Sequence, residues 1–166
     1  GGLSPYHLAG GADIIFQIGT AKNGVRDLNG DLSDEKLIEV ASHPEVKMFE
    51  IKMSQGAKPG KGGILPGSKV SKEIAEIRGI PIGQDAMSPN RHIDINNFDD
   101  LLDMVKRVRD VTGKPTGFKM VIGKPSHIDD LLVAVNKRGL AFAPDFITVD
   151  GAEGGTGAAP MALIDS

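Results

Sequence analysis

The stretch FDDLLDMVKRVRDVTGKPTGFKMVI, residues 98–122, joins a helical pattern to a strand pattern and decides the fold class. From Phe98, apolar residues recur at i, i+3, i+4, i+7 and i+10, with Asp residues early and Lys and Arg residues late in the run, which suits a helix dipole. Its last part, Gly117–Ile122, is short and mostly apolar, and it predicts a strand. A helix followed directly by a strand indicates an α/β fold.

Three other stretches read as strands, because each is short, apolar and followed by Gly or a polar loop. They are Asp13–Ile18, Val46–Met53 and Phe146–Val149. Helical spacing is found between the strands, at Ser33–Ala41, at about Ser71–Arg78 and at Ile128–Val135. Ser126, followed three residues later by Asp129, predicts a capping box at the last of these helices. The segment from Gly79 to Asn96 has no clear period.

Strands that alternate with helices predict right-handed βαβ units and a parallel sheet, either doubly wound or closed as a TIM barrel. No G-x-G-x-x-G lies at a strand-to-helix turn, which disfavours the dinucleotide-binding form of the doubly wound fold. Gly-rich and charged segments instead follow several different strands, as in barrels. A whole barrel needs eight units in roughly 250 residues, so four strands predict another α/β fold or part of a barrel.

Composition excludes several classes of protein. The chain has 166 residues, 19 basic and 22 acidic, for a formal charge of −3, and the two signs are interspersed. This pattern disfavours binding to nucleic acid or to an anionic membrane. There is no Cys, and no stretch approaches the ~18 apolar residues of a membrane helix, so we expect a cytoplasmic protein. The 22 Gly residues are roughly twice the average usage and call for an explanation.

Two Gly-rich loops are candidates for ligand binding. Residues 52–67 contain Lys52, Lys58 and Lys61 among five glycines, which suits an anion-binding loop, although a solvated surface loop has the same composition. Residues 150–160 could form a backbone nest for an anion, with Thr156 as an extra donor, or a tight turn packed on its neighbour.

Single polar residues at the strand ends are further candidates. Lys119 interrupts an apolar strand; inside a barrel it needs an anionic partner, whereas outside it would extend to water between helices. Gln17 and Lys22 could reach a ligand above the sheet, or be an ordinary loop glutamine and an exposed lysine. The four histidines have no metal-site or triad spacing, so we predict no metal site. We interpret His43 and His127 as helix-end residues, and His92 is a candidate to face substrate.

Several of these runs together resemble a known family. They are Gln17–Thr20 (QIGT), 51–70 (IKMSQGAKPGKGGILPGSKV) with Ile74–Arg78, and 150–160 (DGAEGGTGAAP). In this order they resemble the FMN-binding synthase domain of the glutamate synthase family. The resemblance implies a TIM (β/α)8 barrel with FMN at the carboxyl face of its strands, in which residues 1–166 form the central part of a single domain without an internal boundary.

The activity that the resemblance implies is reduction of the imine formed from 2-oxoglutarate and ammonia, giving L-glutamate. It implies Lys119, Gln55 and Lys58 as catalytic residues, with Lys119 beside the flavin N1 and C2 carbonyl, where a cation stabilises the reduced ring, and the other two beside the substrate carboxylates. The cofactor-binding residues that it implies are Gln17, Thr20, Lys52, Lys119, Asp150, Gly154, Gly155, Thr156 and Gly157.

The resemblance also implies an electron donor, either a protein or a nicotinamide cofactor, and ammonia or glutamine-derived nitrogen. Cysteines for an iron–sulfur cluster would fall beyond Ser166. Two other hypotheses stay open: a non-redox barrel acting on a phosphorylated metabolite, and a non-catalytic fragment. Because an incomplete barrel exposes sheet edges, we also expect self-association of the fragment.

Overall fold

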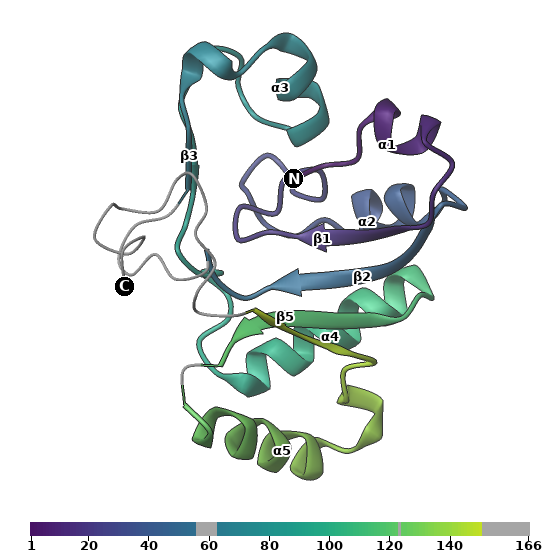
Figure 1. Ribbon diagram of the computed structural model, residues 1–166, viewed down its shortest axis with the longest axis vertical. Coiled ribbons are helices and arrows are strands. Elements are labelled where there is room, and N and C mark those ends of the chain that lie inside the picture. The colour runs from purple at the N-terminus through teal and green to yellow at the C-terminus, as the bar shows by residue number, and fades with distance from the viewer. Residues whose placement is uncertain (56–62, 123, 151–166) are drawn as a thin grey trace.

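A four-stranded parallel sheet is the centre of the molecule. The computed structural model describes residues 1–55, 63–122 and 124–150. The sheet has the order β1-β2-β5-β6, and all neighbours are parallel (Figure 1). Its strands are β1 (Ile14–Ile18), β2 (Val46–Lys52), β5 (Thr116–Val121) and β6 (Ile147–Asp150). The four predicted strands are confirmed, each to within one residue at either end. The arrangement is consistent with part of an α/β barrel.

Four helices connect or flank these strands as the spacing predicts. They are α2 (Asp34–Ala41), α3 (Lys72–Arg78), α4 (Phe98–Thr112) and α5 (Ser126–Arg138). The side chains of Ser33 and Ser71 accept hydrogen bonds from the first turns of α2 and α3, and Asn97 does the same for α4. The predicted capping box at α5 is wrong: Pro125 occupies the N-cap in a helical conformation, so Ser126 already belongs to the helix and no side chain caps it.

Five other short elements of the described residues were not predicted from the sequence. They are α1 (Pro5–Ala9), β3 (Gly63–Leu65), β4 (Ala86–Ser88) and the 3-10 turns η1 (Gly67–Lys69) and η2 (Leu140–Phe142). Strands β3 and β4 form an antiparallel ribbon that pairs Ile64 with Met87. Each strand has three residues, too few to show the alternation of polar and apolar side chains. In Figure 1, β3 lies beyond the carboxyl ends of β1 and β2, and α3 lies above β1.

The two faces of the sheet differ in chemistry because side chains alternate along a strand. One face packs on α2 and α4, which lie behind the strands in Figure 1. Its buried side chains from the strands are Phe16, Ile18, Phe49, Ile51, Phe118 and Met120. The residues between them belong to the opposite face, and the polar ones from β1, β2, β5 and β6 are Gln17, Glu50, Lys52, Lys119, Thr148 and Asp150. In a barrel this polar face is the interior.

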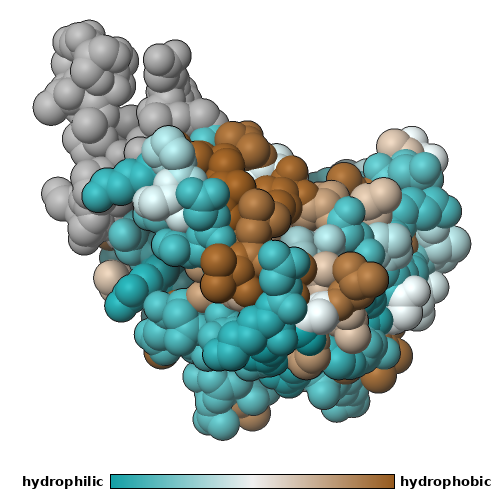
Figure 2. Space-filling view, turned by 90° about the horizontal axis from the view of Figure 1, so that it is seen from below, coloured by the Kyte–Doolittle hydropathy of each residue, from teal (hydrophilic) through white to brown (hydrophobic). Residues whose placement is uncertain are grey.

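The side of the molecule that carries α5 is partly apolar at its surface (Figure 2). Large exposed apolar residues of α5, η2 and β6 are Ile128, Leu132, Val133, Leu140, Ile147 and Val149. Within the described ranges, no helix is both long and apolar enough to cross a membrane.

Candidate functional site

The polar side chains singled out in the sequence gather where the parallel strands end. The arrowheads of β1, β2 and β5 in Figure 1 point to the same side, and β6 is parallel to β5, so the carboxyl ends of the strands meet there. The candidates within the described ranges are Gln17 and Thr20 from β1 and its loop, Lys52 and Gln55 from β2 and its loop, Lys119 from β5 and Asp150 from β6. The structure therefore brings these predicted site residues to one edge of the sheet.

Lys119 has an anionic partner, as its place in an apolar strand requires. Its Nζ lies 3.1 Å from Oδ2 of Asp150, and the two side chains are 22% and 33% exposed. The neighbouring residues Phe118 and Met120 are buried in the core, so Lys119 does not extend outward between the helices. The ammonium is thus held on the polar face, and part of the side chain remains exposed.

Glu50 belongs to this group of polar side chains, although its role was not predicted from the sequence. Its carboxylate accepts a hydrogen bond from Nε2 of Gln17 at 2.6 Å and another from the hydroxyl of Thr148 at 2.6 Å. Gly117, which faces Glu50 in register on β5, presents no side chain between β2 and β6. The carboxylate therefore links three strands across the polar face. A charge between two buried residues, Phe49 and Ile51, was the signal that could have found it.

The side chains of Thr20 and Gln55 are hydrogen-bonded to each other. The Thr20 hydroxyl accepts a hydrogen bond from Nε2 of Gln55 at 2.8 Å and donates one to the carbonyl of Pro89 at 2.6 Å. The backbone N–H of Gln55 donates to the carbonyl of Asn90 at 3.1 Å. These bonds fix the loops after β1 and β2 against the segment that follows β4.

A cavity of about 150 Å³ opens beside these side chains. Its polar lining includes Gln17, Thr20, Lys52, Gln55, Arg78 and Ser88. Arg78 is the last residue of α3, and the resemblance described above gave it no role. The cavity is smaller than the roughly 300 Å³ of drug-sized sites, so it suits a small metabolite or one part of a larger ligand. Two cationic side chains on one small cavity favour an anion.

Lys22 and His92 do not face this cavity, contrary to two of the possibilities raised by the sequence. Lys22 is 4% exposed, and its Nζ lies 2.9 Å from Oδ1 of Asp94. His92 is 1% exposed, and its Nε2 lies 3.0 Å from the carbonyl of Lys52. Burial, helped by the nearby Lys22 cation, lowers the pKa of His92 to about 4. The imidazole is therefore neutral near pH 7 and faces protein.

Some predicted residues lie outside the described part of the chain: Lys58, Gly154, Gly155, Thr156 and Gly157. His43 follows the end of α2 and His127 is the second residue of α5, which confirms both as helix-end residues. Among residues 1–55, 63–122 and 124–150, no three His, Cys, Asp or Glu side chains are grouped so that they could hold a metal ion.

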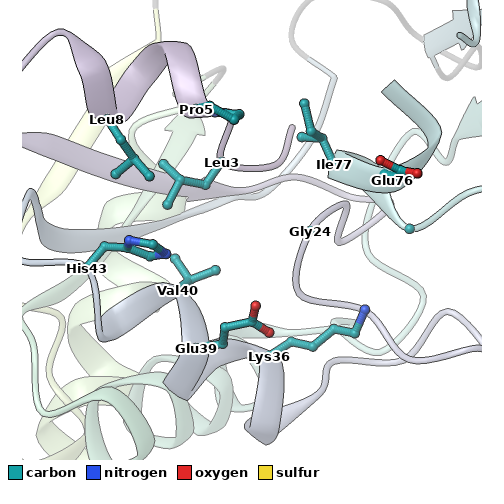
Figure 3. Close-up of a pocket in the computed structure, with 11 residues that line it drawn as sticks. Leu3, Pro5, Leu8, Gly24, Lys36, Glu39, Val40, His43, Glu76 and Ile77 are labelled. Carbon is teal, nitrogen blue, oxygen red and sulfur yellow. The ribbon is translucent and has the colours of Figure 1, made fainter. Parts of the chain in front are cut away.

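A second cavity, of about 320 Å³, lies between α1, α2 and α3. Figure 3 shows its lining, with Lys36 and Glu39 from α2 and His43 just after that helix, opposite Leu3, Leu8 and Ile77. It shares no lining residue with the cavity at the strand ends and contains none of the predicted site residues. The candidate site is therefore the smaller cavity and the polar face beside it.

Comparison with known proteins identifies relatives of this chain. A family model described as a conserved region in glutamate synthase matches residues 1–166. The glutamate synthase large subunit-like protein YerD of Bacillus subtilis (strain 168) is 46% identical over 166 residues, which cover 100% of this chain and 31% of that protein. An archaeal-type glutamate synthase (NADPH) of Thermotoga neapolitana is 42% identical over 118 residues, 70% of this chain and 22% of that protein.

A more distant relative is the ferredoxin-dependent glutamate synthase of Cyanidium caldarium, 37% identical over 146 residues, 82% of this chain and 9% of that protein. The chain spans less than a third of the length of these three curated relatives. Because the family model covers every residue and a relative that is 46% identical matches the whole chain, the chain belongs to the glutamate synthase family.

Proposed function

We propose that this chain is part of an FMN-dependent oxidoreductase of glutamate synthase type, which reduces the imine of 2-oxoglutarate and ammonia to L-glutamate. The observation that carries the proposal is the pairing of a small cavity lined by Lys52 and Arg78 with a further cation, Lys119, on the same face of the sheet. The first two suit the carboxylates of an oxo acid, and the third suits a redox cofactor.

In the cavity, Arg78 would bind one carboxylate through two parallel hydrogen bonds and Lys52 would bind the other as a point charge. The amide of Gln55, already oriented by its bond to Thr20, would donate its remaining N–H to the same ligand. These contacts hold the carbon skeleton so that only the keto carbon, where nitrogen replaces oxygen, faces the interior of the barrel.

The side chains on the polar face fit a flavin. Gln17 and Lys119 carry hydrogen-bond donors there, and the side chain of Lys119 is 22% exposed. When bound, FMN would supply the hydride that adds to the C=N bond. Lys119 would stabilise negative charge on the cofactor, and Asp150 would keep the ammonium in place.

The domain arrangement belongs to the proposal too. Residues 1–166 would form the central part of one FMN-binding barrel in a cytoplasmic enzyme. The electron donor would be a protein or a nicotinamide cofactor, since the names of the relatives above include both ferredoxin and NADPH. An iron–sulfur cluster would take its ligands from outside this chain, which contains no Cys.

The test is made on the full-length protein. We expect a yellow preparation with flavin absorbance, and glutamate formation from 2-oxoglutarate, ammonium and a chemical reductant. A colourless preparation that neither binds FMN nor forms glutamate, and that binds phosphorylated sugars, would overturn the proposal in favour of a non-redox barrel.

A further inference from the structure

Residues Ser88–Asp94, here called the strap, run across the ends of β1 and β2 on the side of the candidate cavity. The Pro89 carbonyl accepts from Thr20, the Asn90 carbonyl accepts from the N–H of Gln55, and Arg91 forms an isolated antiparallel bridge with Ser54. The strap therefore contacts the backbone or side chain of both loops that carry cavity residues.

His92 adds a contact to the backbone of a third cavity residue. A carbonyl oxygen only accepts, so the 3.0 Å contact to Lys52 means that Nε2 of His92 carries the proton and donates it. The ring is 1% exposed and lines neither the cavity nor the polar face. His92 thus contacts the point where β2 ends without reaching a ligand.

Lys22 fixes the far end of the strap. It has a φ of 54°, unusual for a residue other than Gly, and its N–H closes a turn onto the carbonyl of Gly19 at 2.8 Å. Both this conformation and the burial of a charge are unfavourable by themselves. The ion pair with Asp94 compensates for the buried charge, so the turn after β1 and the end of the strap depend on each other.

We propose that His92 and the Lys22–Asp94 pair are positioning residues: through the strap they hold Thr20, Lys52 and Gln55 in the arrangement that binds the oxo acid. This inference rests on the proposed function for its kinetic consequence. It concerns residues that touch neither the substrate nor the cofactor, so their replacement should change substrate affinity more than the rate of the chemical step.

The first experiment compares His92→Gln with His92→Leu in the full-length protein. Gln keeps a donor for the Lys52 carbonyl, whereas Leu fills the space without one. We expect Leu to raise KM for 2-oxoglutarate about tenfold, the usual effect of one lost hydrogen bond, with kcat within about twofold, and Gln to restore most of the affinity. Lys106→Met is the control: it breaks the ion pair with Asp110 on α4, away from the strap, and should leave KM at the wild-type value. Equal losses in both His92 variants would overturn the proposal.

The second measurement does not depend on activity. The N–H of Gln55 bonds to Asn90 of the strap, whereas the N–H of Met53 bonds to the carbonyl of Lys119 on β5 at 3.0 Å. In His92→Leu, we expect hydrogen exchange at Gln55 to accelerate about tenfold and exchange at Met53 to stay at the wild-type rate. Unchanged exchange at Gln55, or equal acceleration at both amides, would overturn the proposal.

Failure of the proposed function can be distinguished from failure of the proposal about the strap. If the wild-type protein forms no glutamate from 2-oxoglutarate and ammonium, the proposed function fails and the exchange comparison alone decides on the strap. If His92→Leu does not fold, Asp94→Asn takes its place, because the Asp94 side chain is 47% exposed and its replacement leaves no cavity. The same acceleration at Gln55 alone is expected.

Discussion

Lys52 and Lys119 are register partners on the adjacent strands β2 and β5, so two lysines lie side by side on the polar face of the sheet. Like charges that face each other on neighbouring strands are destabilising unless anions lie close to them. Asp150 supplies one such anion for Lys119. Lys119 belongs to the proposed cofactor site and Lys52 to the proposed substrate cavity. The two proposed ligands would therefore lie beside adjacent strands.

Replacement of Lys119 tests the proposed cofactor role. We expect Lys119→Ala in the full-length protein to slow flavin reduction by about 10² or more, because charge stabilisation at the reacting centre is lost. The fold should survive, since the side chain is on the polar face and outside the core. Stopped-flow absorbance measures the reduction and thermal unfolding measures the fold. Near-normal turnover would contradict the role.

Replacement of Arg78 tests the substrate cavity. Arg78→Gln keeps a hydrogen-bond donor but removes the charge and the paired donors, so we expect KM for 2-oxoglutarate to rise about tenfold to a hundredfold. Flavin content should stay at the wild-type level because Arg78 is on α3, away from Lys119. Steady-state kinetics and the flavin-to-protein absorbance ratio check both statements. An unchanged KM would remove Arg78 from the site.

Two replacements of Glu50 separate its hydrogen bonds from its charge. Glu50→Leu leaves the Gln17 amide and the Thr148 hydroxyl without an acceptor, so we expect a loss of about 2–4 kcal/mol in the free energy of unfolding. Glu50→Gln keeps an acceptor for Gln17, while the hydroxyl of Thr148 can turn to accept; its loss should stay below about 1 kcal/mol. Urea unfolding measures both. Equal losses would show that the charge matters more than the bonds.

The lowered pKa of His92 predicts how stability depends on pH. Its pKa falls from 6.5 to about 4 on folding, so the unfolded chain binds more protons between these two values. The free energy of unfolding should therefore be level above pH 6.5 and decrease by up to about 3 kcal/mol as the pH falls toward 4. The cation of Lys22 and the carboxylate of Asp94 are the charged groups that face the ring.

Asp94 contributes in a lower window. The strongest influence on its carboxyl is burial, which raises the pKa, but the hydrogen bond and charge of Lys22 outweigh it and hold the pKa below 3.8. Its contribution to the free energy of unfolding is thus lost only below that pH.

Urea unfolding of His92→Gln at several pH values tests the contribution of the histidine. The decrease in the free energy of unfolding between pH 6.5 and 4 should disappear in this variant. Persistence of the wild-type slope would mean that another group titrates there.

The sequence predicted the four strands and the helices α2 to α5 because each has a clear period and a Gly or polar boundary. The ribbon of β3 and β4 could not be predicted, since three residues show no period and their pairing depends on residues far apart in sequence. Lys119 and Gln55 were predicted as site residues, and the structure brings them to the same edge of the sheet as Arg78. Their catalytic and binding roles stay predictions.

Glu50 and the pair Lys22–Asp94 show where sequence reasoning stopped. A carboxylate in an apolar strand is as unusual as a lysine, but its partners Gln17 and Thr148 come from distant strands. Asp94 lies 72 residues from Lys22, so only the path of the chain reveals that they pair. His92 was a candidate to face substrate because of its residue type. Its ring is buried, however, and it donates a hydrogen bond to the backbone carbonyl of Lys52.

The long connection from β2 to β5 has a consequence for how such enzymes diversify. It carries α3, the strap and the Arg78 side of the cavity, whereas Lys119 and Asp150 come from β5 and β6. Of the residues assigned to the oxo acid, Gln55 and Arg78 therefore belong to this connection, whereas Lys52 belongs to β2. Exchange of residues 53–97 between relatives would change Gln55, Arg78 and the strap while Lys52, Lys119 and Asp150 stay in place, which makes this connection the natural unit for altering substrate preference.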